Sequence, residues 1–136
     1  MADKPTIRVV CAAIVDDGRY LISQRNAGAV LPLLWEFPGG RVEPGERDEA
    51  ALLRELHYRL GIEAEVREVL SQTRREYSAY IVHLRLYRCE LGPRPARPLR
   101  VRDLAWVPSD EFDLYTFTPA DERAVSALLF AERATD

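Results

Sequence analysis

The stretch between Gly40 and Ile62 limits the fold of this chain more than any other part of the sequence. It begins among two groups of chain-breaking residues, Gly39-Gly40 and Pro44-Gly45, which should interrupt regular structure before Glu46. The segment after Glu46 carries apolar residues at helical spacing instead. The stretch therefore predicts a glycine-bent loop that leads into a helix.

The ends and one face of this helix can also be predicted. Asp48 is suited to cap its start, and Gly61 is a helix stop. Positions three and four apart share a helix face, so residues 55, 58 and 59 should be neighbours. Glu55 supplies a carboxylate on that face, whereas the other two positions carry Tyr58 and Arg59. The face is therefore mixed in charge.

These residues resemble the signature of the Nudix hydrolase family, G-x5-E-x7-R-E-U-x-E-E-x-G-U, in which U is a bulky aliphatic residue. The matching positions are Gly40, Glu46, Arg54, Glu55, Leu56, Gly61 and Ile62. Tyr58 and Arg59 replace the two adjacent glutamates, which makes this a degenerate Nudix box. Residues 23–25, 35–40 and 118–121 are similar to the MutT and CTP-pyrophosphohydrolase branch of the family. The resemblance spans nearly the whole chain.

The resemblance implies an α/β fold, a Nudix α/β/α sandwich. The box helix would lie on one face of a mixed central sheet and the C-terminal helix on the other. The order of predicted elements agrees with this, with strands at 7–15, 19–25, 35–37, 65–75, 79–90 and 104–107. Asp16-Asp17-Gly18 predicts a hairpin turn, and Thr118-Pro119 predicts the start of the last helix. We expect a single domain over residues 1–136.

Composition narrows the choice of partners. A formal net charge of -3 argues against a general binder of polymeric nucleic acid. No apolar run approaches about 18 residues, so we expect no membrane partner and a cytoplasmic protein. Cys11 and Cys89 lie in predicted strands and are interpreted as small buried apolar side chains. A homodimer is left open by the sequence.

The Nudix resemblance implies a reaction as well. Members cleave a nucleoside diphosphate linked to a further group by attack of water on phosphorus, with Mg²⁺ or Mn²⁺ to neutralise the phosphates. Such cations prefer oxygen ligands, and three carboxylates at i, i+3 and i+4 would supply them. Only Glu55 remains of the three, so we predict weak metal binding through it. The alternative for Glu55 is an exposed helix carboxylate that pairs with Arg59.

The resemblance assigns a supporting role to residues around Glu55. Glu46 and Arg54 would orient the loop and the helix through an ion pair, and they complete the candidate catalytic set with Glu55. Gly39 and Gly40 would provide backbone freedom at a turn.

Five residues are candidates for substrate binding: Arg25, Arg41, Arg59, Arg100 and Asp121. By resemblance, Arg25 approaches the α-phosphate or the sugar, Arg41 approaches phosphate, and Asp121 hydrogen-bonds the base. Arg100 stands six residues before Trp106, where several relatives place a further glutamate. The alternatives are a solvated charge for Arg25 and Arg41, and for Asp121 a first-turn carboxylate favoured by the helix dipole.

Three hypotheses for function follow. The leading one is a divergent Nudix hydrolase with a weakened metal site, acting on a nucleoside triphosphate or another nucleoside diphosphate derivative. The second is a binding protein whose arginines replace the metal and hold a nucleotide or other diphosphate-containing small molecule without turnover. The third is a structural or interaction protein that keeps only the fold.

Overall fold

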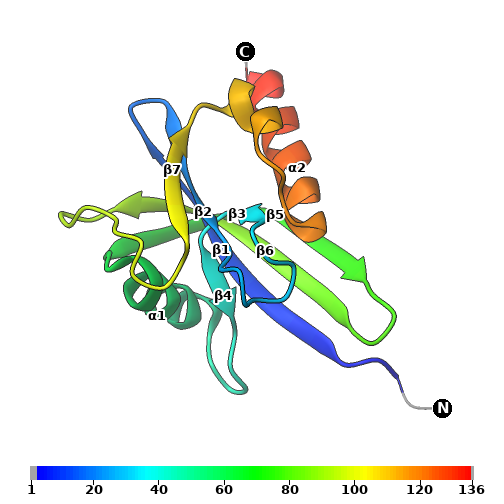
Figure 1. Cartoon of the computed structure of the whole chain (residues 1–136). Coiled ribbons are helices and arrows are strands. Elements are labelled where there is room, and N and C mark those ends of the chain that lie inside the picture. The colour runs from blue at the N-terminus through cyan, green and yellow to red at the C-terminus, as the bar shows by residue number, and fades with distance from the viewer. Residues whose placement is uncertain (1–2, 136) are drawn as a thin grey trace.

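The computed structural model describes residues 3–135, and the side chains of residues 3–130. The elements are shown in Figure 1. In chain order they are β1 (Thr6–Asp16), β2 (Arg19–Gln24), β3 (Trp35–Glu36), β4 (Gly39–Arg41), α1 (Asp48–Leu60), β5 (Ala64–Glu76), β6 (Ile81–Leu91), β7 (Asp103–Val107), the 3-10 helix η1 (Ser109–Leu114) and α2 (Pro119–Thr135). No helix in this described part is long and apolar enough to cross a membrane.

The seven strands form one mixed sheet. Its main path is β3-β2-β1-β6-β5, while β4 pairs with β1 and β7 pairs with β2. β1 and β6 run parallel, and the other pairs are antiparallel. The predicted hairpin between β1 and β2 is confirmed: Asp17 and Gly18 both have positive φ, which a two-residue turn of this kind requires.

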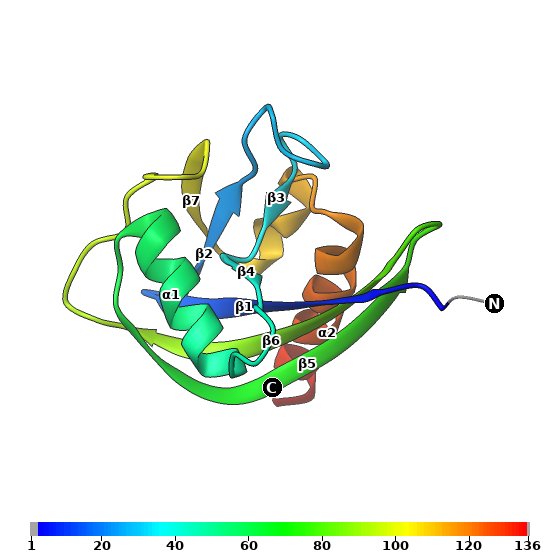
Figure 2. The same ribbon diagram turned by 90° about the horizontal axis from the view of Figure 1, so that it is seen from below.

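Strand β1 contributes to two separate cores. Val10, Ala12 and Ile14 pack with the apolar residues of α1, whereas Cys11 and Ala13 pack with those of α2. Consecutive residues of a strand point to opposite faces of the sheet, so a strand that is covered on both faces must be apolar throughout. Figure 2 shows α1 on one side of the central strands and α2 on the other. The predicted α/β/α sandwich is confirmed.

Two local predictions were wrong. Gly39 and Gly40, expected to break regular structure, form the strand β4 against β1, and neither has a positive φ. Asp48 does not cap α1: the N-cap position is Arg47, and Asp48 is the first helical residue. The cap at the other end follows the prediction, because Gly61 has φ 68 and donates its N–H to the carbonyl of His57.

Asp48 instead attaches α1 to the sheet. Its buried carboxylate accepts hydrogen bonds from the hydroxyl of Tyr87 at 2.7 Å, from Arg85 at 2.9 Å and from Arg8. Burial alone would raise the pKa of Asp48, but the bonds from Tyr87 and Arg85 and the charge of Arg8 bring it below its ordinary value. Because these partners lie on β1 and β6, the helix start is held in a defined position over the sheet.

Candidate functional site

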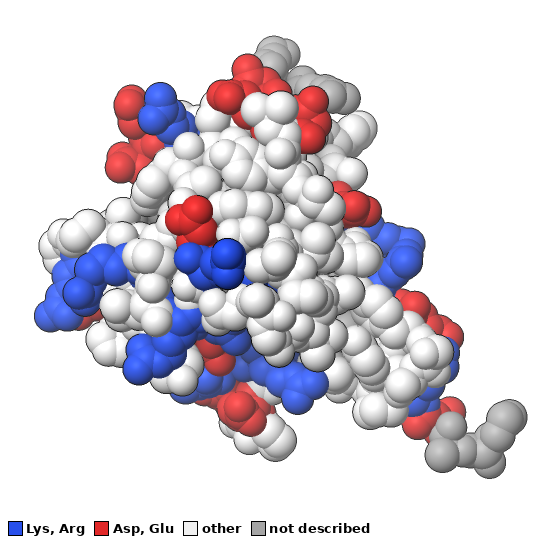
Figure 3. Space-filling view, viewed as in Figure 1, with Lys and Arg blue, Asp and Glu red and all other residues white. Residues whose placement is uncertain are grey.

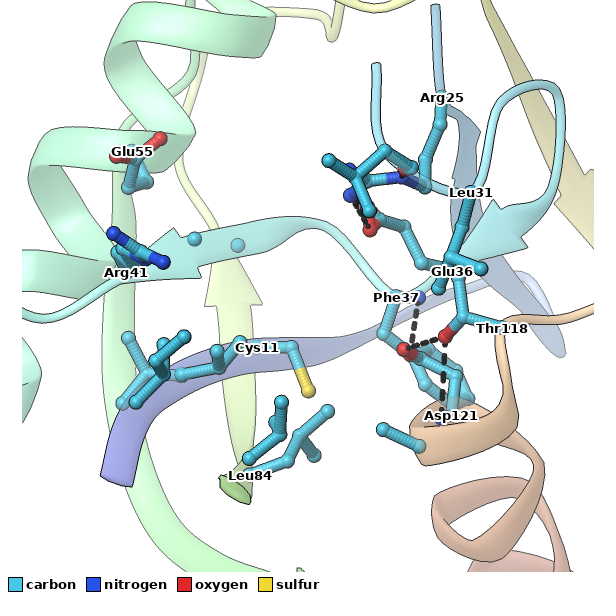
Figure 4. A pocket seen from close by; sticks show the side chains of 18 of the residues that line it. Cys11, Arg25, Leu31, Glu36, Phe37, Arg41, Glu55, Leu84, Thr118 and Asp121 are labelled. Atoms are coloured by element: carbon cyan, nitrogen blue, oxygen red, sulfur yellow. Dashed lines mark hydrogen bonds and ion pairs between the residues drawn. The ribbon is translucent and has the colours of Figure 1, made fainter. Parts of the chain in front are cut away.

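A cavity of ≈ 590 Å³ brings most of the predicted site residues together. It is lined by β1, β4, α1, the turn between β5 and β6, and the start of α2. Figure 4 shows Glu55 and Arg41 on one side of it, and Arg25, Glu36 and Asp121 on the other. We call the first side the α1 side and the second the α2 side.

On the α1 side, Arg54 joins the loop after β4 to the helix. Its Nε and Nη2 donate to the two carboxylate oxygens of Glu46, both at 2.9 Å, and Nη2 also donates to the carbonyl of Arg41 at 2.9 Å. Glu46 accepts the backbone N–H of Glu43 as well, at 3.0 Å. The hydrogen bonds from Arg54 and Glu43 lower the pKa of Glu46 to about 2. The loop is therefore fastened by the ion pair that the sequence predicted.

Glu55 is buried, with 7% of its surface exposed. One carboxylate oxygen accepts from Nη1 of Arg54 at 2.8 Å, and the other accepts from Nε of Arg59 at 2.6 Å. The alternative of an exposed Glu55 is wrong, although its predicted pairing with Arg59 is present. Each oxygen of Glu55 thus accepts a hydrogen bond from an arginine of its own helix.

The glycines of β4 allow β4 to lie very close to β1 on one side and to Glu55 of α1 on the other. A Cβ atom on Gly39 would lie 2.0 Å from the carbonyl oxygen of Val10, and one on Gly40 would lie 2.4 Å from Cδ of Glu55. Cβ atoms do not show contacts this short, so a side chain at Gly39 would require the β1 backbone to shift, and one at Gly40 would require the Glu55 side chain to shift. The need for glycine comes from close packing, and the predicted need for turn conformation is wrong.

Arg100 is not among the residues that line the cavity, and its predicted role in substrate binding stays a prediction. Its guanidinium carbon lies 4.4 Å from the centre of the Tyr58 ring, a cation–π contact. Nη1 of Arg100 also donates to the carbonyl of Tyr58 at 3.2 Å, and its backbone N–H donates to the carbonyl of Arg59 at 3.0 Å. Arg100 therefore fastens the loop between β6 and β7 to the end of α1.

On the α2 side, Asp121 is buried at the start of α2. Its carboxylate accepts the backbone N–H of Phe37 at 3.0 Å and the hydroxyl of Thr118 at 2.6 Å. The bond to Thr118 fits the alternative of a first-turn helix carboxylate, yet Asp121 also lines the cavity. Burial, and then the charge of Glu36, raise the pKa of Asp121 to about 7. This group can accept or donate a proton near neutral pH.

Arg25 reaches the cavity next to Asp121. Its Nη1 donates to both carboxylate oxygens of Glu36, at 3.0 and 3.3 Å, and its Nε donates to the carbonyl of Val30 at 2.7 Å. Burial raises the pKa of Glu36, and the charge and hydrogen bonds of Arg25 partly offset that rise. Nε and Nη1 of Arg25 are thus used within the protein.

Sequence reasoning missed Glu36 and an aromatic wall of the cavity. Glu36 lies between Trp35 and Phe37, and an acid between two aromatic residues near a basic strand end is a signal that could have identified it. Tyr77 and Tyr80 also line the cavity, where their rings stack with centres 5.0 Å apart. The two residues flank the turn between β5 and β6. Their separation of three residues in the sequence did not indicate that both would line a cavity.

Comparison with known proteins decides the family. A family model described as NUDIX domain matches residues 9–127. This chain belongs to the Nudix family. The Nudix chain is 38% identical over 123 residues to the CTP pyrophosphohydrolase of Escherichia coli (strain K12), a match that covers 90% of this chain and 91% of the relative. The predicted membership of this family is confirmed.

Two solved structures support the same assignment. The solution structure of the E. coli ORF135 protein has a TM-score of 0.83 and 36% sequence identity, and the match covers 96% of this chain and 94% of that one. The crystal structure of the MutT NUDIX hydrolase from Burkholderia pseudomallei has a TM-score of 0.82 and 27% identity, with coverage of 91% and 98%. The predicted MutT-like character of the Nudix fold is confirmed by these two.

The donor set does not fit the divalent cation that the Nudix resemblance implies. Both oxygens of Glu55 accept from arginines, and Tyr58 and Arg59 supply no carboxylate. Among the described side chains, those of residues 3–130, there is no group of three or more His, Cys, Asp or Glu residues that could hold a metal ion. An ion beside Glu55 would share its oxygens with two guanidinium groups, whose positive charge opposes a divalent cation.

Proposed function

We propose that this Nudix protein hydrolyses nucleoside triphosphates by attack of water on phosphorus. The observation that carries the proposal is the two-sided cavity, which offers cations on the α1 side and an apolar region with a buried acid on the α2 side. A nucleotide has the same division, with charged phosphates at one end and a flat base at the other. The name of the E. coli relative, a CTP pyrophosphohydrolase, supports this substrate class.

Arg41 and Arg59 are the residues that we assign to the phosphates. Both line the cavity, and the guanidinium group forms charge-assisted, fork-like hydrogen bonds to phosphate oxygens. Figure 3 shows Lys and Arg side chains gathered over the part of the surface where α1 and β4 lie. Fixed positive charge of this kind stabilises the negative charge that develops during attack on phosphorus.

The base is assigned to the α2 side. Asp121 offers a carboxyl group whose pKa is raised to about 7, so it can present either an O–H or an oxygen acceptor near neutral pH. Cys11, Phe37 and Leu84 are buried apolar residues of the same cavity wall. A flat base would lie against these side chains and form its polar contact with Asp121.

No step is assigned to a metal ion, because the donor set does not fit one. Each oxygen of Glu55 can still accept from a water molecule, but the guanidinium groups of Arg54 and Arg59 compete with the water for these oxygens. We therefore expect slow turnover.

The test is incubation of the purified protein with CTP, dCTP, GTP and 8-oxo-dGTP, each with Mg²⁺, with Mn²⁺ and with EDTA. Chromatography and a pyrophosphate assay would follow nucleoside monophosphate and pyrophosphate. We expect both products from at least one nucleotide, with lower yield in Arg41→Met. Arg67→Met is the matched control, because Arg67 pairs with Glu65 and Glu90 on exposed strand positions. Absence of product from every nucleotide in all three conditions would overturn the proposal.

A further inference from the structure

Three positions where the resemblance places metal-binding glutamates carry Tyr58, Arg59 and Arg100. The structure separates them into two kinds. Tyr58 and Arg100 stack on each other away from the cavity lining, whereas Arg59 is part of that lining. Of the replaced positions, therefore, Arg59 alone has access to a ligand in the cavity.

The side chain of Arg59 is held in place from one side only. Its Nε donates to Glu55 at 2.6 Å, and 34% of the side chain is exposed. Within residues 3–130, Glu55 is the one hydrogen-bonding partner of this guanidinium. Its two terminal amino groups therefore remain for a ligand, and they form the donor fork that suits phosphate.

The backbone at Arg59 is also restrained. Its carbonyl accepts the N–H groups of Leu99 and Arg100, at 3.1 and 3.0 Å, so the last turn of α1 is fastened to the loop between β6 and β7. The stacking of Arg100 on Tyr58 strengthens the same attachment. The cationic group is thus presented by a rigid element, and little ordering is needed when a ligand binds.

Formal charge on the α1 side is balanced without any added ion, because Arg41, Arg54 and Arg59 are matched by Glu43, Glu46 and Glu55. The carboxylate of Glu55 is shared by two guanidinium groups, those of Arg54 and Arg59. Arg41 adds a further cation on the same side of the cavity. The positive charge of Arg59 also acts on Glu36, on the other side of the cavity. It lowers the pKa of Glu36 and so partly offsets the rise caused by burial.

We propose that Arg59 takes the place of the divalent cation, so that this chain binds the diphosphate group of a nucleotide directly and in the absence of metal. The inference rests on the proposed function for the choice of ligand, and it concerns binding, which is measured separately from turnover. The ion-pair partner Glu55 serves to position Arg59 and does not act as a metal ligand.

Isothermal titration calorimetry tests whether Arg59 binds a diphosphate without metal. The ligands are inorganic pyrophosphate and CTP, both in EDTA. We expect wild-type protein to bind both, and Arg59→Met to bind at least roughly tenfold more weakly, because a charge-assisted contact is lost. Arg59→Lys should retain part of the affinity. Arg67→Met should bind like wild type. Addition of Mg²⁺ should not strengthen binding of pyrophosphate to the wild-type protein.

Binding that appears only with Mg²⁺ or Mn²⁺, or unchanged affinity in folded Arg59→Met, would overturn the inference. If Arg59→Met does not fold, Arg59→Gln replaces it, since Gln can still donate to Glu55 but carries no charge. The two proposals fail separately. Binding in EDTA without any product overturns the hydrolase proposal alone, and turnover with metal but no binding in EDTA overturns this inference alone.

Discussion

Two buried carboxylates in the cavity differ in the groups that hold them. Glu55 on the α1 side is 7% exposed, and Asp121 on the α2 side is 5% exposed. Glu55 accepts hydrogen bonds from two arginines, whereas Asp121 accepts from a backbone amide and a hydroxyl group. Similar burial is therefore combined with cationic partners in one case and neutral partners in the other.

The comparison teaches that two similarly buried acids can differ in role because their hydrogen-bonding partners differ. Burial, and then the charge of Glu36, raise the pKa of Asp121 to about 7, and no hydrogen-bonding cation offsets this rise. Its charge can then change near neutral pH, which suits recognition of a base. Glu55 is part of an ion-pair network with Arg54 and Arg59, and the terminal amino groups of Arg59, which form no hydrogen bond to the described side chains, suit phosphate.

The largest effect that we expect comes from Asp121→Asn. The folded state holds the proton of Asp121 more tightly than the unfolded chain, so its contribution to stability is complete below pH 3.8 and is lost as the pH rises to about 7. Each pKa unit corresponds to about 1.36 kcal/mol. Wild-type protein should lose stability relative to Asp121→Asn between pH 4 and pH 7. Urea denaturation over this range measures the difference, and a constant difference would contradict the raised pKa.

Gly40→Ala should disturb the α1 side alone. The added methyl group meets the carboxylate of Glu55, which must move away from Arg54 and Arg59. We expect a loss of roughly 1–3 kcal/mol in the free energy of unfolding, from overpacking and broken hydrogen bonds. Gly28→Ala is the control, because a Cβ there meets nothing within 4 Å. Equal stability of the two variants in urea would show that Glu55 is not tightly held.

Tyr58→Glu combined with Arg59→Glu should make the α1 side resemble a metal site. Three carboxylates would then lie at positions 55, 58 and 59, where mutual repulsion favours a divalent cation. We expect at least a roughly tenfold gain in Mg²⁺ affinity over wild type, a change worth about 1.4 kcal/mol. Calorimetry with MgCl₂ measures it. No gain would mean that carboxylates at positions 58 and 59 do not form a cation site with Glu55.

Glu46→Gln should have the smallest effect. Hydrogen bonds from Arg54 and Glu43 lower the pKa of Glu46 to about 2, so its stabilising contribution is complete above its ordinary pKa of 4.5 and is lost as the pH falls toward 2. The unfolding midpoints of wild type and Glu46→Gln should differ slightly at pH 7 and converge on acidification. Thermal unfolding at pH 7, 4 and 2.5 measures this, and midpoints that move apart in acid would contradict it.

Features that depend on nearby residues could be predicted from the sequence. The helix α1, its stop at Gly61 and the pairing of Arg54 with Glu46 all arise within a short segment. The hydrogen bond from Phe37 to Asp121 joins residues 84 positions apart, and no local pattern encodes it. The strand β4 was missed for the same reason, because its glycines are explained by close contact with β1 and α1.

By itself, the sequence determined the family, the sandwich architecture and the set of arginines that replace glutamates, since these depend on residue identity and short-range spacing. Only the tertiary structure decided which arginine faces the cavity. Arg59 lines it and Arg100 does not, although the sequence treats them alike. The reason is physical: the loop that carries Arg100 packs against the end of α1, and that packing directs one guanidinium onto Tyr58 while the other stays beside Glu55.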